Sequence, residues 1–238
     1  MVNTHIERVE AHDGGAFDSF CAVPDGGRGP GVLLFQEVFG VNDNMRGLAG
    51  RLADEGYLVL VPDMFWRVRP GFESPDEAGL AEGMSLAGQM DQDLAVHDMS
   101  SALGHLLGMP GCTGKVGAVG FCFGGGVVNR MAAGSPDLGA AVPYYGVQIP
   151  VEMVPAIRAP LLLQYAENDE NINKGIGAYE TALAANNKKY AIYIYPGTQH
   201  AFNNDTGAAR YNKAAADLAW ERTLAFFKEH LGAPPRAA

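Results

Sequence analysis

The stretch that decides the fold is Gly120-Phe121-Cys122-Phe123-Gly124-Gly125. It follows a short apolar run at 115–119 and precedes residues 126–133, which can form a helix. Strand, sharp turn and helix is the order of a nucleophile elbow, whose turn leaves no room for side chains two residues before and after the reactive residue. Serine is the usual residue at the tip, and here it is a cysteine. We interpret Cys122 as a nucleophile; the alternative is a buried structural cysteine in a Gly-rich turn.

Strand-like and helix-like patterns alternate along the rest of the chain. Two alternating segments at the start, separated by Asp13-Gly14-Gly15, predict an antiparallel hairpin. Compact apolar runs then alternate with amphipathic runs, which is the pattern of a mostly parallel sheet with helices on both faces. Together with the elbow, this predicts an α/β-hydrolase fold. The expected strands are 4–11, 16–23, 31–35, 57–61, 116–119, 140–145, 161–166 and 190–195, and the expected helices are 44–55, 91–107, 126–133, 174–185 and 208–230.

Size and charge narrow the classes of function. With 238 residues, 47% of them hydrophobic, and no linker or repeat, the chain fits one domain, 1–238, with a loose tail at 232–238. The 17 basic and 27 acidic residues give a net charge of −10 and no basic face for nucleic acid. No apolar run is long enough to cross a bilayer, and the first residues lack the build of a signal peptide. The three cysteines, Cys21, Cys112 and Cys122, are expected to be reduced in a cytoplasmic protein.

A cysteine that attacks a carbonyl needs a base, because a thiol of ordinary pKa, ~8.5, is only slightly ionised at neutral pH. In α/β-hydrolases the acid and then the histidine follow the nucleophile along the chain. Only His200 and His230 follow Cys122, and His230 ends the last expected helix. The candidate base is therefore His200, in the loop after the strand at 190–195.

The acid is expected in the loop after the strand at 161–166. Three acids compete there: Glu167, Asp169 and Glu170. Asp169 is favoured because it lies far enough past the strand end to turn back toward the loop of His200. The residues alone leave the choice open.

Two backbone N–H groups are needed to hold a developing oxyanion. One is expected from the residue after the nucleophile, Phe123, and the other from the loop after the strand at 31–35. That loop reads Gln36-Glu37-Val38-Phe39-Gly40, and Val38 is the candidate donor. The alternative is a simple strand-to-helix connection.

These segments resemble the dienelactone hydrolase family, the carboxymethylenebutenolidase-like α/β-hydrolases with a cysteine nucleophile. The resemblance implies that Cys122, Asp169 and His200 form the triad, and that Glu37 interacts with the resting thiol and can accept its proton. The alternative for Glu37 is an ion pair with a basic residue such as Arg46. The matching segments follow the family order over most of the chain: 36–40, Val61-Pro62-Asp63, 120–125, Tyr144-Tyr145-Gly146, the Asp169 loop, and Tyr195-Pro196-Gly197 followed by His200-Ala201-Phe202.

The chain departs from the family pattern at a residue that holds the substrate carboxylate in family enzymes. Family enzymes that act on dienelactone hold its carboxylate with arginines, one of them four residues after the histidine, where this chain has Asn204. Either the substrate is neutral, or Arg67 or Arg69 takes over this contact. The other expected substrate contacts are aromatic residues in or beside the matching segments: Phe39, Trp66, Tyr144 and Phe202.

The sequence thus predicts a hydrolase that cleaves a small ester or lactone through Cys122, His200 and Asp169 and an acyl-enzyme. No metal or other cofactor is expected, because no His, Cys or Asp spacing is typical of a zinc site. A non-catalytic ligand-binding protein on the same fold is the alternative, since a fold does not imply an activity. A thiol redox protein is disfavoured, because the chain has no Cys-X-X-Cys. The natural substrate and the oligomeric state stay open.

Overall fold

The central element of the molecule is one eight-stranded sheet, seen in a computed structural model that describes residues 2–75 and 77–234. The strand order is β1-β2-β4-β3-β5-β6-β7-β8. β1 and β2 form an antiparallel hairpin at one edge, β2 runs antiparallel to β4, and the other pairs are parallel. The strands are β1 (Asn3–Glu10), β2 (Ala16–Val23), β3 (Gly29–Phe35), β4 (Leu58–Pro62), β5 (Cys112–Phe121), β6 (Ala140–Tyr144), β7 (Leu161–Asn168) and β8 (Tyr190–Gln199).

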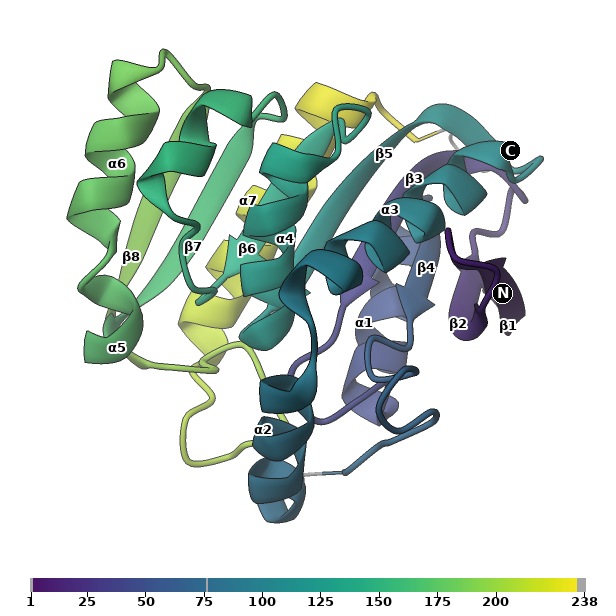
Figure 1. The fold of residues 1–238 in the computed structure, drawn as a ribbon, viewed down its shortest axis with the longest axis horizontal. Helices are drawn as coiled ribbons and strands as arrows, with labels where there is room; N and C mark the ends of the chain where they lie inside the picture. The colour runs from purple at the N-terminus through teal and green to yellow at the C-terminus, as the bar shows by residue number, and fades with distance from the viewer. Residues whose placement is uncertain (1, 76, 235–238) are drawn as a thin grey trace.

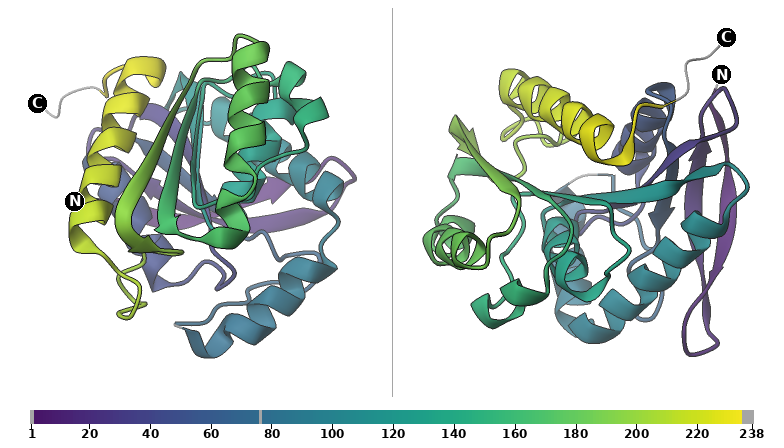
Figure 2. Two further views of the ribbon diagram at one scale, coloured as in Figure 1. Left: turned by 90° about the vertical axis from the view of Figure 1, so that its left-hand side faces the viewer. Right: turned by 90° about the horizontal axis from the view of Figure 1, so that it is seen from above.

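Helices cover both faces of this sheet (Figure 1). Side chains alternate along each strand, so in β3 Leu33 and Phe35 pack in the core on the side of α3, α4 and α6, whereas Val32 and Leu34 pack on the side of α1 and α7. Figure 2, seen from above, shows these two helical layers on either side of the sheet. The α-helices are α1 (Asp43–Asp54), α2 (Leu80–Gln89), α3 (Gln92–Gly108), α4 (Phe123–Gly134), α5 (Glu170–Asn173), α6 (Ile176–Ala185) and α7 (Lys213–Leu231), and the 3-10 helices are η1 (Glu77–Gly79) and η2 (Val151–Ala156).

The predicted α/β-hydrolase architecture, with its N-terminal hairpin and a mostly parallel sheet, is confirmed. Because the strands from β3 to β8 run parallel, their carboxyl ends meet at one edge of the sheet. The loop at 36–40, Cys122, Asp169 and His200 all follow such ends. The topology therefore gathers residues that are far apart in the sequence.

Two elements at this edge differ from the expectation. The last helix begins at Lys213 rather than at 208, because Asn212 caps it by accepting a hydrogen bond from Ala215 N–H at 3.1 Å. Residues 200–212 instead form a loop, and α2, which was not expected, lies beside it (Figure 1). Of the expected loose tail, residues 235–238 lie outside the described part of the chain. In the described part, no helix combines the length and apolar character needed to span a membrane.

Candidate active site

Cys122 lies at the tip of a tight turn between β5 and α4. Its φ of 54° and ψ of −114° are strained for any residue but glycine, at a cost of order 1–3 kcal/mol. Neighbouring backbone holds the turn: Cys122 N–H donates to the carbonyl oxygen of Tyr144 at 3.1 Å. A Cβ on Gly124 would lie 2.6 Å from the carbonyl oxygens of Phe35 and Gln36, so only glycine fits there. This is the geometry that the sequence predicted for the elbow.

His200 is held between Asp169 and Cys122. Its Nδ1 donates to Asp169 Oδ2 at 2.5 Å, and the Cys122 side chain lies close enough to raise its pKa. Burial acts to lower the pKa of His200, but the hydrogen bonds and charges of Asp169 and Cys122 outweigh it and raise the pKa to about 10. The imidazole therefore lies between a carboxylate and the sulfur of Cys122, and both partners favour its protonated form.

The two competing acids of the β7 loop are placed elsewhere. Glu167 is exposed and accepts a hydrogen bond from Gly197 N–H at 2.8 Å. Glu170 is exposed and begins α5. Of the three acids, Asp169 is the one that contacts His200, and it is only 9% exposed.

Residues 36–40 form the loop after β3 and lie against the first turn of α4. Gly124 N–H donates to the carbonyl oxygen of Gln36 at 3.0 Å, which fixes the loop beside the elbow. Val38 and Phe39 are buried, and both line the cavity at Cys122. Phe123 opens α4, where N–H groups have no partner within the helix. The backbone N–H groups of Val38 and Phe123 are thus in the two segments from which oxyanion donors come.

Glu37 is buried at this site, and both of its carboxylate oxygens are occupied. Tyr145 Oη donates to Oε1 at 3.0 Å, and Asn204 Nδ2 donates to Oε2 at 2.6 Å. Burial raises the pKa of Glu37, and the two donors oppose that rise. The alternative of an ion pair with Arg46 is wrong, because Arg46 pairs with Glu73 at 2.8 Å.

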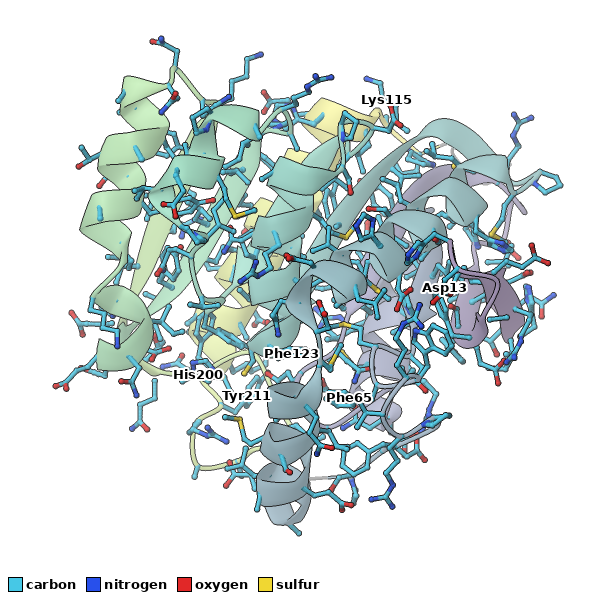
Figure 3. The ribbon with its side chains drawn as sticks, in the orientation of Figure 1. Asp13, Phe65, Lys115, Phe123, His200 and Tyr211 are labelled. Carbon is cyan, nitrogen blue, oxygen red and sulfur yellow. The ribbon has the colours of Figure 1, made fainter. Side chains whose placement is uncertain are left out.

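A cavity of about 120 Å³ opens at the thiol. The loop after β3, the elbow, the 200–212 loop and α2 contribute its walls. Figure 3 shows His200 and Phe123 at the edge of the sheet that faces α2. Arg210 also lines the cavity, and its guanidinium pairs with Glu77 of η1. The apolar lining residues are Val38, Phe39, Leu80, Met84 and Ala201.

Trp66 and Arg67 lie outside this cavity, so the structure does not support them as substrate contacts. Arg67 forms a bidentate pair with the buried Asp98, at 2.6 and 2.7 Å, and a further pair with Asp13 at 2.9 Å. Trp66 Nε1 donates to the same Asp98 at 2.9 Å, and its ring stacks on Phe17. The cluster ties the loop after β4 to α3 and to the hairpin turn, and Asp13 lies well away from His200 in Figure 3.

Arg69, Tyr144 and Phe202 are also absent from the cavity walls. Arg69 pairs with an acid of α2. Tyr144 is fully buried, and its hydroxyl shares a 2.7 Å hydrogen bond with Thr223 of α7, on the opposite face of the sheet. Phe202 is fully buried against Tyr145. Tyr145, which the sequence analysis did not single out, lies just beyond the end of β6 with a φ of 37°, and its ring lies 5.0 Å from that of His200.

Three further features of the site were missed by the sequence analysis: Tyr145, which bonds to Glu37, the cavity-lining pair Leu80 and Met84, and the cavity-lining residue Arg210. Tyr145 had a sequence signal, because it directly follows a strand and precedes Gly146 at the carboxyl edge. Leu80 and Met84 also had one, because residues four apart share one face of a helix. Arg210 had no local signal, because its position depends on the path of the whole 200–212 loop.

The other two cysteines lie away from the site. Cys21 is fully buried in β2, and burial raises its pKa to about 12. Cys112 begins β5 and Cys122 follows its end, which at ~3.3 Å per residue separates them by about 30 Å. Within residues 2–75 and 77–234, no group of three or more His, Cys, Asp or Glu side chains is placed to hold a metal ion.

The fold and the elbow define the class: this is an α/β-hydrolase with a cysteine where most members carry a serine. Comparison with known proteins narrows the class. The chain belongs to the dienelactone hydrolase family, which matches residues 17–231, and it is a hydrolase.

Individual relatives match nearly the whole chain. A candidate carboxymethylenebutenolidase of Azospirillum brasilense is 34% identical, over 94% of this chain and 98% of the relative. A carboxymethylenebutenolidase of Pseudomonas putida is 31% identical, over 92% of this chain and 93% of the relative. The crystal structure of a candidate dienelactone hydrolase from Klebsiella pneumoniae superposes with a TM-score of 0.86 at 28% identity, covering 96% of this chain and 99% of the other.

Proposed function

We propose that this protein hydrolyses a small ester or lactone through a thiol nucleophile and an acyl-enzyme. The observation that carries the proposal is the 2.5 Å hydrogen bond between His200 and Asp169, beside a small cavity that both Cys122 and His200 line. An imidazole beside a thiol can take up the thiol proton, which makes the sulfur a nucleophile, and can then give that proton to the leaving alkoxide. The names of the relatives, carboxymethylenebutenolidase among them, support an ester or lactone as substrate.

Acylation of the enzyme is the first half-reaction. The Cys122 thiol gives its proton to His200, Sγ attacks the carbonyl carbon as a thiolate, and the carbonyl oxygen takes up the negative charge. The N–H groups of Val38 and Phe123 stabilise that oxyanion. When the intermediate collapses, the carbon–oxygen bond of the ester breaks and the imidazolium of His200 gives its proton to the leaving alkoxide. In a lactone the alcohol formed stays attached to the acyl group.

Deacylation follows the same path with water as nucleophile. His200, now neutral, takes a proton from a water molecule, which attacks the thioester carbon. Collapse of this second intermediate expels the thiolate and releases the carboxylic acid. Asp169 keeps Nδ1 protonated throughout and stabilises the imidazolium each time it forms.

The cavity suits a small acyl group with an anionic substituent. Its volume of about 120 Å³ and its apolar walls admit a short chain or a small ring. Arg210 supplies a guanidinium at the same cavity, and its present partner, Glu77, is half exposed and can be replaced by a substrate carboxylate. We therefore assign to Arg210 the contact that the sequence suggested for Arg67 or Arg69.

A substrate screen with matched cysteine variants tests the proposal. The wild type should turn over p-nitrophenyl acetate, a simple lactone or a dienelactone, and Cys122→Ala should abolish that turnover. Cys112→Ala is the matched control, because that thiol lies at the far end of β5, and it should keep wild-type rates. Stoichiometric labelling of Cys122 without turnover of any of these substrates would favour the ligand-binding alternative instead.

A further inference from the structure

The amide of Asn204 has its orientation fixed by the loop that carries it. Its Oδ1 accepts hydrogen bonds from Thr206 N–H at 3.0 Å and from Thr206 Oγ1 at 2.7 Å. A backbone N–H can only donate, so the oxygen of the amide must face Thr206 and the NH2 group must face Glu37. The 2.6 Å contact from Nδ2 to Glu37 Oε2 is therefore a donation to the carboxylate.

Tyr145 holds the other carboxylate oxygen of Glu37. It directly follows β6 with a positive φ of 37°, and its N–H donates to the carbonyl oxygen of Gln164 at 2.7 Å. A strained backbone of this kind persists only where its surroundings fix it. The hydroxyl donates to Glu37 Oε1, so the carboxylate is fixed between two donors, and neither of them is Cys122.

We propose that Asn204 is a positioning residue for the nucleophile: together with Tyr145 it holds Glu37 away from Cys122, so that the thiol stays paired with His200 before any substrate binds. This deepens the proposed function and rests on its assignment of Cys122 as nucleophile. The family resemblance implied the reverse arrangement, with Glu37 on the resting thiol. The difference is tied to the residue four positions after the histidine, which is asparagine here.

The groups that face Glu37 decide how its carboxylate behaves when the hydrogen bond from Asn204 is lost. Tyr145 and Asn204 are its hydrogen-bond partners, and the charges of His200 and Arg210 also act on it. Arg210 is already paired with Glu77. Glu37 and Cys122 line the same cavity. A carboxylate released from Asn204 can therefore accept a hydrogen bond from the thiol, which keeps the sulfur protonated, or draw the imidazolium toward itself, and either event breaks the Cys–His pair.

The experiment measures alkylation of the resting enzyme by iodoacetamide from pH 5 to 10, without substrate. The thiolate displaces iodide and forms a thioether, so the rate reports the fraction of thiolate. Asn204→Ala should lower the rate at pH 6 by at least about tenfold. Tyr145→Phe, which keeps the ring, should act in the same direction.

Two further variants separate this role from a merely structural one. Asn44→Ala removes a hydrogen bond to Asp205 of the same loop without touching Glu37, and it should keep the wild-type profile. Glu37→Gln combined with Asn204→Ala removes the charge that was released, and it should restore fast alkylation at pH 6. Wild-type profiles in both Asn204→Ala and Tyr145→Phe would overturn the proposal, as would a double variant that stays slow. If the hydrolysis screen fails while these alkylation results hold, the proposed function is rejected, and the positioning of Glu37 by Asn204 and Tyr145 is still supported.

Discussion

Gly83 of α2 packs directly against Val38 of the loop after β3: a Cβ on Gly83 would lie 1.9 Å from the carbonyl oxygen of Val38. Because the Val38 carbonyl oxygen belongs to the backbone, the clash can be relieved only if the helix or the loop shifts. Gly83→Ala should therefore displace the N–H group of Val38 from the oxyanion position. A misplacement of about 1 Å can cost about 10²-fold in rate, and we expect a loss in kcat/KM of that order.

The same helix supplies the control for this variant. A Cβ on Gly88 would meet nothing within 4 Å, so Gly88→Ala should leave kcat/KM unchanged. It raises the helix propensity of α2 as much as Gly83→Ala does. Equal kinetics in the two variants would show that the contact between α2 and Val38 has no bearing on the reaction.

The pKa of His200 should depend on the thiol. Burial alone lowers this pKa, and Asp169 and Cys122 raise it to about 10. Cys122→Ala removes one of the two raising partners and leaves the burial, so the pKa of His200 should fall. Ring-carbon chemical shifts followed by NMR across pH 5 to 11 measure this, with Cys112→Ala as control. An unchanged pKa in Cys122→Ala would mean that the thiol and the imidazole do not interact.

Arg67 should matter for stability and not for turnover. It is the bidentate partner of Asp98, whose side chain is only 3% exposed, so Arg67→Ala leaves a buried carboxylate without its cation. Breaking such a pair costs about 3 kcal/mol. Urea unfolding should show a loss of this order, while kcat/KM at 25 °C stays at the wild-type value. A selective loss of activity on acidic substrates would contradict this prediction and show that Arg67 contacts the substrate.

Arg210 should instead control the preference for an acidic substrate. The comparison is kcat/KM for a lactone that carries a carboxylate and for its methyl ester. Loss of a charge-assisted contact weakens binding by about tenfold or more, so Arg210→Ala should lower kcat/KM for the acid by about that factor beyond any change for the ester. Arg69→Ala, which removes an exposed guanidinium paired with Glu82, is the control. An identical loss for both substrates in Arg210→Ala would count against a carboxylate contact.

The sheet and the elbow could be predicted because their signals are local. Gly120 and Gly124 flank Cys122 in the sequence itself, and the buried strands appear as compact apolar runs. The parallel order then places His200 and Asp169 at the same edge. For His200, chain order and strand ends were enough to choose the candidate, whereas for Asp169 they left Glu167 and Glu170 open and the family resemblance decided.

The wall of the cavity could not be predicted in this way, because it depends on how separate segments pack. Tyr144, the last residue of β6, bonds to Thr223 of α7, whereas the backbone of Tyr145 turns to a positive φ just after the strand and its hydroxyl reaches Glu37. Arg67 looked available in the sequence, since its partner Asp98 is 31 residues away on α3. Arg210 reaches the cavity only because Asn212 starts α7 late enough to leave a long loop.

The most direct test of the central claim is mass spectrometry of the enzyme quenched during turnover of p-nitrophenyl acetate. Formation of an acyl-enzyme predicts that the chain gains the mass of one acetyl group and that proteolysis places it on the peptide containing Cys122. Cys122→Ala should show neither the added mass nor turnover, and Cys112→Ala should show both. Acetylation at another residue, or hydrolysis by Cys122→Ala at the wild-type rate, would contradict the account.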